Sequence, residues 1–226
     1  MRLTGIEKNY GKKAVLKNLC LEIEPEQVTC VFGRSGAGKT TLLNVLAGMI
    51  EHDGELFGAP QSVGYVFQED RLISHLTVVE NLRFVGGRDE VIDEFLAKTS
   101  LRPLRDRKIS TLSGGEKRRV SLLRAFCVDS DLVLLDEPFG ALDAITKEEM
   151  IAFTASLLRQ KKVAAVLVTH DVDEALSIAD KVAVLADGKI VAELPLPAGE
   201  KPREYGKLAA LREELLEILR KTTAKD

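Results

Sequence analysis

The sequence predicts an α/β fold with a mostly parallel sheet. Five short apolar runs are typical of strands that are covered on both faces, because they contain few polar residues. They span residues 28–32, 132–135, 163–168, 181–185 and 190–194. Helical patterns alternate with several of these runs, and such alternation favours parallel strands joined by helices. The predicted helices span residues 39–46, 146–159 and 173–179.

Composition and charge fit an ordinary globular protein. The 226 residues are 45% hydrophobic and 30% charged, which is enough for a sizeable core in one large domain, with or without a subdomain. The net charge of −3 gives no bulk electrostatic reason to bind nucleic acid. The basic run Lys117-Arg118-Arg119 is therefore interpreted as a solvated helix face. Three cysteines without a CxxC spacing argue against a disulfide framework.

The first part of the chain predicts a small antiparallel β layer. Leu19, Leu21 and Ile23 alternate with polar residues, as in a half-buried strand. Residues 54–57 and 62–67 read as further short strands of this layer.

The middle of the chain, from about residue 78 to 126, predicts an α-helical subdomain inserted in the α/β core. Strand patterns are missing there and helical periodicity replaces them. Val91, Ile92, Phe95 and Leu96 fall on one helical stripe.

The C-terminal end, residues 201–226, predicts a charged amphipathic helical tail outside a domain that spans residues 1–200. Its apolar residues share one helical face. They are Leu208, Leu211, Leu215, Ile218 and Leu219. We expect this face to dock on the chain's own domain, and contact with a partner is the alternative.

Neither a secretory leader nor a membrane span is expected. The first residues lack the apolar core of a signal peptide. No apolar stretch approaches the roughly 18–20 residues that cross a bilayer. We therefore expect a cytoplasmic protein that reaches the membrane through a partner.

A phosphate-binding loop is predicted between the first buried strand and the first helix. Gly33-Arg34-Ser35-Gly36-Ala37-Gly38-Lys39-Thr40 matches the pattern G-x-x-x-x-G-K-[ST]. Glycines let backbone N–H groups curl around phosphate, and the helix that continues from Thr41 adds its positive dipole end. The Lys39 ammonium reaches the β- and γ-phosphates and the Thr40 hydroxyl binds Mg²⁺. The prediction is thus a P-loop NTPase core that binds ATP and Mg²⁺. A glycine-rich turn without a ligand is the alternative.

Two acids end the buried strand 132–135. Such acids are costly unless a cation lies nearby, so Asp136 is predicted to face Mg²⁺. Adjacent strand residues face opposite ways, which leaves Glu137 free to act as general base toward a water in line with the γ-phosphate. The alternative is a plain strand followed by a turn at Pro138.

Leu112-Ser113-Gly114-Gly115-Glu116 decides among nucleotide-binding families. This motif lies between the phosphate loop and the acid pair. With its three motifs in this order, the chain resembles the ATP-binding-cassette (ABC) family over about residues 1–195. Two departures stand out: Glu116 replaces a commoner glutamine, and the helical insert is short.

The resemblance implies further site residues. Tyr10 corresponds to the aromatic that stacks on adenine, although a plain surface aromatic is the alternative. Gln68 corresponds to the glutamine that contacts Mg²⁺ and water, with an ordinary polar loop residue as its alternative. His170 corresponds to the histidine that contacts the γ-phosphate. Ser113, Gly114 and Gly115 correspond to the signature that covers the ATP of a second copy in a head-to-tail dimer.

The family resemblance also implies the biological role. Residues 137–143, Glu-Pro-Phe-Gly-Ala-Leu-Asp, resemble the nitrate, sulfonate and taurine uptake branch. This implies an ATP hydrolase on the cytoplasmic face of the cell membrane, bound to transmembrane permease subunits and indirectly to a substrate-binding protein. The permease helix is expected in a groove near Gln68 and His75. An exporter or lipid-handling complex is the alternative. A nucleic-acid role is disfavoured, because the stretch between Gln68 and Ser113 is too short for the long coiled coils of those ABC proteins.

Overall fold

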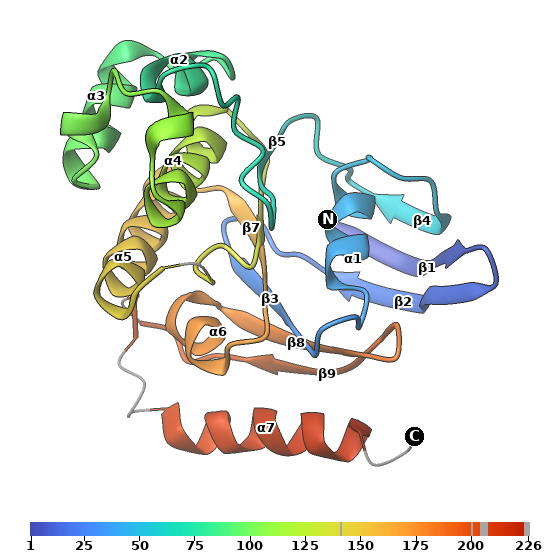
Figure 1. Cartoon of the computed structure of the whole chain (residues 1–226). Helices are drawn as coiled ribbons and strands as arrows, with labels where there is room; N and C mark the ends of the chain where they lie inside the picture. The colour runs from blue at the N-terminus through green and yellow to red at the C-terminus, as the bar shows by residue number, and fades with distance from the viewer. Residues whose placement is uncertain (141, 200, 204–207, 224–226) are drawn as a thin grey trace.

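The fold is built on two β-sheets (Figure 1). The computed structural model describes residues 1–140, 142–199, 201–203 and 208–223. The larger sheet has six strands in the order β5-β6-β7-β3-β8-β9. They are β3 (Val28–Phe32), β5 (Val63–Val66), β6 (Leu132–Asp136), β7 (Ala164–Thr169), β8 (Lys181–Ala186) and β9 (Lys189–Pro195). Five of them run parallel, which confirms the predicted α/β class.

β9 corrects one expectation, because it pairs antiparallel with β8. Its residues alternate between exposed and partly buried, unlike the fully buried β3 and β6. The two-residue connection from Ala186 to Lys189 allows a hairpin and leaves no room for the crossover that a parallel strand needs.

The smaller sheet has the order β2-β1-β4 and is antiparallel, as predicted for the N-terminal part. Its strands are β1 (Arg2–Tyr10), β2 (Lys13–Glu22) and β4 (Asp53–Phe57). The segment 62–67, which we expected here, instead forms β5 of the large sheet. The sequence pattern does not predict β1, because register shifts on both sides of Ile6 break the alternation of buried residues.

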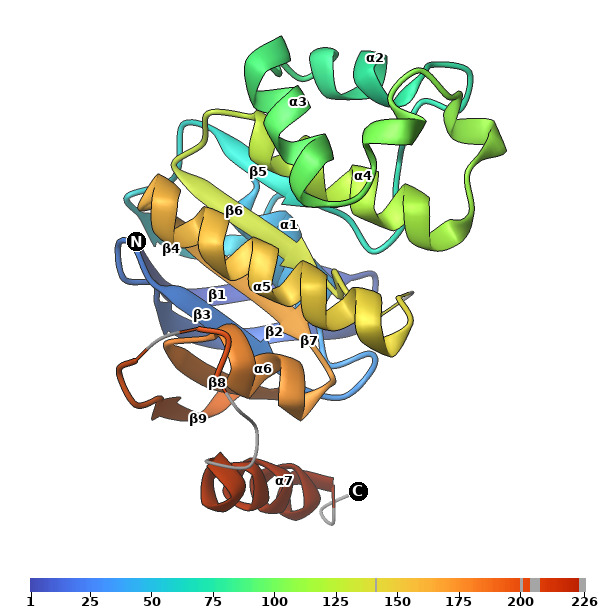
Figure 2. The same ribbon diagram turned by 90° about the vertical axis from the view of Figure 1, so that its left-hand side faces the viewer.

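Helices cover both faces of the large sheet. They are α1 (Lys39–Leu46), α5 (Ala144–Lys161) and α6 (Val172–Ile178). Neighbouring residues of β6 point to opposite faces: Val133 and Leu135 join the core under α5 and α6, while Leu132 and Leu134 join the core between the two sheets that contains α1. Figure 2 shows α5 and α6 on the same face of the large sheet. This layering leaves the ends of β3, β6 and β7 together at one edge.

A group of helices lies beyond the β5–β6 edge (Figure 2). They are α2 (Val78–Arg83), α3 (Asp89–Lys98) and α4 (Gly114–Cys127), with short 3₁₀ turns η1 (Arg102–Leu104) and η2 (Ile109–Thr111). Thr77 and Ser113 begin α2 and α4 with capping boxes, in which each side chain accepts from the backbone of a glutamate three residues later.

The C-terminal helix α7 (Ala209–Thr223) packs along α6 and β8, and Figure 1 shows it below them. Leu215 is fully buried there, and Arg212 Nε donates to Asp173 Oδ1 over 3.0 Å. The apolar face of the predicted tail therefore docks on the chain's own fold. Among the described helices, none is both long and apolar enough to cross a membrane.

Candidate functional site

The loop between β3 and α1 forms a tight cradle. Gly36 and Gly38 have φ angles of 80° and 104°, in the left-handed region that favours glycine. A Cβ on Gly33 would lie 2.4 Å from the carbonyl oxygen of Leu185, so this position has no room for a side chain. The loop therefore follows its path only with glycines at these places, and it leads into the N-terminus of α1.

Lys39 lies inside this cradle and is 6% exposed. Its Nζ donates to the carbonyl oxygens of Gly33 (2.9 Å) and Arg34 (3.0 Å). Burial lowers the pKa of Lys39, and the neighbouring Glu137 and Asp136 oppose that shift. An ammonium that is poorly solvated and held by neutral carbonyls is well prepared to bind an anion.

A polar cavity of about 280 Å³ opens in front of this loop. It is lined by Lys13, Val15, Ser35, Gly36, Gly38, Lys39, Thr40, Thr41, Gln68 and Glu137. The structure thus brings Gln68 and Glu137, which are predicted site residues far apart in sequence, to the phosphate loop. Lys13 and Val15 are lining residues that the sequence analysis missed. They belong to β2, and no local sequence pattern indicates that this strand lies against the loop between β3 and α1.

The two acids face different surroundings. We expected this from strand alternation, but β6 ends at Asp136 and Glu137 lies in the turn that follows. Asp136 is 2% exposed, and this burial raises its pKa, as does the nearby Glu137. A hydrogen bond with the Thr40 side chain and the charges of Lys39 and Arg118 act the other way. A buried carboxylate beside a hydroxyl is a donor set that suits Mg²⁺.

Glu137 adopts a φ of 46°, an uncommon value for a residue with a side chain. Its Oε1 lies 3.8 Å from Lys39 Nζ and 3.1 Å from His170 Nδ1. The strained turn therefore directs the carboxylate toward the cavity, between the lysine of one motif and the histidine of another.

His170 is 63% exposed and follows β7. Buried contacts fix the turn behind it: Thr169 Oγ1 donates to Glu174 Oε2 over 2.6 Å and accepts from the backbone N of Asp171. Lys147 of α5 completes the network, since its Nζ lies 2.6 Å from both Asp171 and Glu174. No local pattern marks Lys147, because its partners Asp171 and Glu174 follow the next strand, β7.

The remaining predicted residues lie outside this cavity. Ser113, Gly114 and Gly115 are not among the described residues that line it, and they begin α4 on an exposed or half-exposed surface. Tyr10 is 49% exposed at the end of β1, paired with Lys13. Arg34 and Ala37 line a neighbouring cavity that α7 borders. Ala141, which follows the acid pair, lies outside the described residues.

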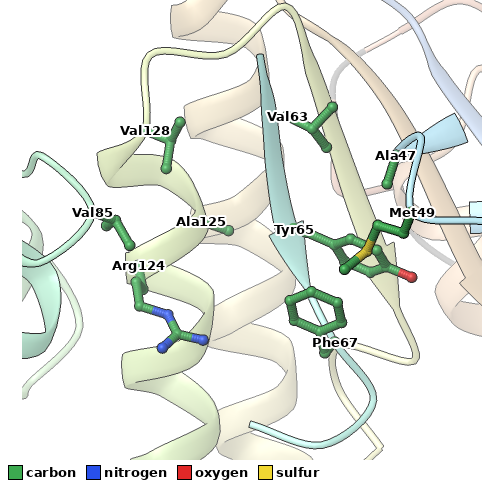
Figure 3. Close-up of a pocket in the computed structure, with 9 residues that line it drawn as sticks. All are labelled: Ala47, Met49, Val63, Tyr65, Phe67, Val85, Arg124, Ala125 and Val128. Carbon is green, nitrogen blue, oxygen red and sulfur yellow. The ribbon is translucent and has the colours of Figure 1, made fainter. Parts of the chain in front are cut away.

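A second hollow, of about 290 Å³, is mainly apolar and is lined by residues of β5 and α4 and of the segments that follow α1 and α2 (Figure 3). Met49, Tyr65 and Phe67 lie on one side, and Val85 and Arg124 on the other. The Tyr65 and Phe67 rings stack at 3.9 Å, and the guanidinium of Arg71 lies 4.0 Å from the centre of the Phe67 ring. We call this hollow the apolar groove. Neither Gln68 nor His75, near which we expected a groove, is among its described lining residues, although Phe67 adjoins Gln68.

A protein-family model described as "ABC transporter" matches residues 16–140. The chain belongs to the ABC transporter family. The match spans the phosphate loop, Gln68, the signature residues and the two acids of β6. The family assignment makes the chain an ATP-binding and ATP-hydrolysing protein with Mg²⁺ as the usual metal ion, as predicted.

Two relatives are similar to this chain over most of its length. The chain is 39% identical to the aliphatic sulfonates import ATP-binding protein SsuB of Corynebacterium glutamicum, over 97% of this chain and 93% of the relative. It is 40% identical to the protein of the same name from Granulibacter bethesdensis, over 96% and 93%.

Solved structures agree with the fold. The ATP-binding cassette MJ0796, in a dimeric post-hydrolysis state with ADP and Pi, matches with a TM-score of 0.77 and 27% identity. The match covers 88% of this chain and 99% of that structure. A second dimeric structure of MJ0796 gives a TM-score of 0.78. The ABC chain therefore has the cassette fold predicted from its motifs.

Proposed function

We propose that this chain is the ATPase subunit of an importer for a small solute such as a sulfonate, nitrate or a taurine-like compound. The observation that carries this proposal is the convergence of Lys39, Gln68 and Glu137 on one polar cavity, in a chain whose relatives are named as sulfonate import proteins. It works on the cytoplasmic face of the membrane, with permease subunits as partners and a substrate-binding protein as an indirect one.

ATP binds with its phosphates in the cradle. The backbone N–H groups of residues 33–41 and the Lys39 ammonium hold the β- and γ-phosphates. Tyr10 stacks on adenine, and its exposure and its pairing with Lys13, which lines the cavity, support this role. Thr40, Asp136 and Gln68 hold Mg²⁺, directly or through water. When bound, Mg²⁺ neutralises the charge that develops on the transferred phosphoryl group.

Hydrolysis uses the pair Glu137 and His170. Glu137 accepts a proton from water as the water attacks the γ-phosphorus, and the leaving oxygen remains on ADP. His170 holds the Glu137 carboxylate through its Nδ1 and contacts the γ-phosphate. The network around Thr169 and Lys147 supports this role by fixing the turn that carries His170.

The signature residues complete the site of a second copy. Ser113 and Gly114 are exposed and Gly115 is half-exposed at the N-terminus of a fourteen-residue helix, and they are not among the described residues that line the chain's own cavity. A helix N-terminus attracts anions. In a head-to-tail dimer each such terminus covers the γ-phosphate held by the other copy.

Ser113→Arg should prevent ATP-dependent dimerisation, because the bulky side chain occupies the space that the γ-phosphate of the other copy needs. ATP binding by the isolated chain should change by less than about 3-fold, which is under 1 kcal/mol. Light scattering with and without ATP measures the dimer, and a fluorescent nucleotide measures binding. Ser113→Ala is the control. It removes the same N-cap hydrogen bond, which contributes about 1 kcal/mol to helix stability, but it adds no bulky side chain. Loss of ATP binding in the arginine variant would contradict this assignment.

A helix of the permease is proposed to dock in the apolar groove. The groove is open, presents Met49 at 52% exposure, and lies beside the loop that carries Gln68. An apolar helix face with an acidic residue near Arg71 fits this chemistry.

Met49→Glu should separate the chain from its permease while leaving ATP hydrolysis intact, because a carboxylate in this contact would be desolvated. We expect at least about 10-fold less chain on membranes that carry the permease, which is about 1.4 kcal/mol of binding. Phe57→Glu, at a similarly exposed phenylalanine of β4, is the control and should bind normally. Equal recovery of the Met49 variant and of the native chain would refute docking at this groove.

A further inference from the structure

Arg118 is buried, although its basic run Lys117-Arg118-Arg119 predicts a solvated helix face. It lies on α4, five positions after Ser113, and its side chain is 3% exposed. Burial lowers the pKa of its guanidinium. A buried cation is costly unless its donors are satisfied, so the contacts of Arg118 show what this residue holds in place.

One side of the guanidinium holds the end of β6 and the turn that follows it. Nε donates to the carbonyl oxygen of Pro138 over 2.8 Å. Nη2 donates to the carbonyl oxygens of Asp136 (2.9 Å) and Glu137 (2.7 Å). Glu137 is the residue with the strained φ of 46°. The contact to its carbonyl therefore stabilises the backbone conformation that directs its carboxylate to the cavity.

The other side holds the segment around Gln68. Nη1 donates to the carbonyl oxygens of Phe67 (2.6 Å) and Gln68 (3.3 Å) and lies 3.3 Å from Asp70 Oδ1. Phe67 also lines the apolar groove. One planar group with a fixed fork of donors thus joins the groove, Gln68 and Glu137.

Arg124, six residues further along α4, reinforces the same attachment. Its guanidinium donates to the carbonyl oxygens of Asp70 (3.1 Å) and Arg71 (2.8 Å). The loop after Gln68 is therefore held to the signature helix at two points, while the turn after Asp136 is held through Arg118. A shift of α4 or of the groove wall must move these carbonyls with it.

We propose that Arg118 is a positioning residue for hydrolysis, which sets Glu137 and Gln68 relative to the signature helix that carries Ser113. Through Arg118, the position of Glu137 depends on two contacts. One is the docking of Ser113 on a second copy, and the other is the binding of a partner in the apolar groove. This inference rests on the proposed function, because it assigns Arg118 to the same ATP site.

The test is steady-state ATPase kinetics of purified Arg118→Met and Arg118→Lys chains. Methionine keeps the volume and removes every donor, whereas lysine keeps a buried cation but lacks the two-sided fork. We expect kcat to fall at least about 10-fold in both, with KM for ATP within about 2-fold, which is the signature of an interaction lost only in the transition state. The control is Arg119→Met, whose native side chain donates to Thr99 within the helical group and which should keep its kcat.

A double-mutant cycle separates positioning from general support. In a Glu137→Gln background, Arg118→Lys should lower the residual rate by less than about 2-fold, because its effect acts through Glu137. Native kcat in Arg118→Lys would overturn the inference, and so would a parallel loss of ATP binding. If Arg118→Met does not fold, Arg118→Lys decides alone. Failure of the native chain itself to bind or hydrolyse ATP would instead refute the proposed function.

Discussion

Lys39→Ala should raise the Kd for Mg-ATP by about 100-fold or more. The native ammonium lies in the glycine cradle, 6% exposed, and supplies the buried cation of this loop. Replacing its two carbonyl contacts by phosphate oxygens gives charge-assisted hydrogen bonds, each worth about 1.5–3 kcal/mol. Loss of about 3 kcal/mol corresponds to roughly 100-fold in Kd.

The Lys39 variant should still fold. Burial lowers the pKa of Lys39 below its unfolded value, so the unfolded chain binds this proton more tightly than the folded one. The charge on Lys39 therefore lowers the free energy of unfolding. This effect is complete at pH values below the folded pKa, fades as the pH rises from the folded to the unfolded pKa, and is absent above the unfolded pKa. Removing the ammonium at neutral pH consequently does not remove a stabilising charge.

Thermal unfolding with increasing Mg-ATP measures both effects. ATP that binds only the folded state raises the free energy of unfolding by RT ln(1 + c/Kd), where c is the concentration of free ATP, and it raises the Tm accordingly. At the same ATP concentration the Tm of the native chain should therefore shift and that of the Lys39→Ala chain should not. Lys98→Ala, which removes an exposed lysine paired with Glu94 on α3, is the control and should shift as the native chain does. Native affinity in the Lys39 variant would exclude this loop as the phosphate site.

Glu137→Gln should reduce ATP hydrolysis by at least about 100-fold, because an amide cannot accept the proton of the attacking water. ATP affinity should stay or increase, since the change removes a negative charge that lies 3.8 Å from Lys39 Nζ, close to where the phosphates bind. With binding intact and hydrolysis blocked, the two copies should remain closed around ATP. Phosphate release in a single turnover measures the rate, and light scattering with ATP measures the trapped dimer.

Glu149→Gln is the control for this charge change, since Glu149 is exposed on α5, away from the cavity. It should hydrolyse ATP at the native rate and stay monomeric after turnover. Native turnover in Glu137→Gln would remove Glu137 from the reaction. Slow turnover without a trapped dimer would instead separate hydrolysis from the proposed dimer cycle.

Short local patterns predict the chemistry of each motif. The loop 33–40 and the pair Asp136-Glu137 are runs of neighbouring residues, so one short pattern records both the backbone shape and the reactive groups. Buried strands such as Val28–Phe32 are similarly local, and their predicted bounds agree with the structure.

Long-range contacts in the fold set which of these segments lie together. Segment 62–67 forms β5 of the large sheet, β9 pairs antiparallel with β8, and Lys13 lines the polar cavity. Arg118 reads as an ordinary surface arginine until the fold places it against Phe67 and Glu137. The physical reason is that pairing partners and burial depend on contacts between residues far apart in the chain, which periodicity and local motifs do not record.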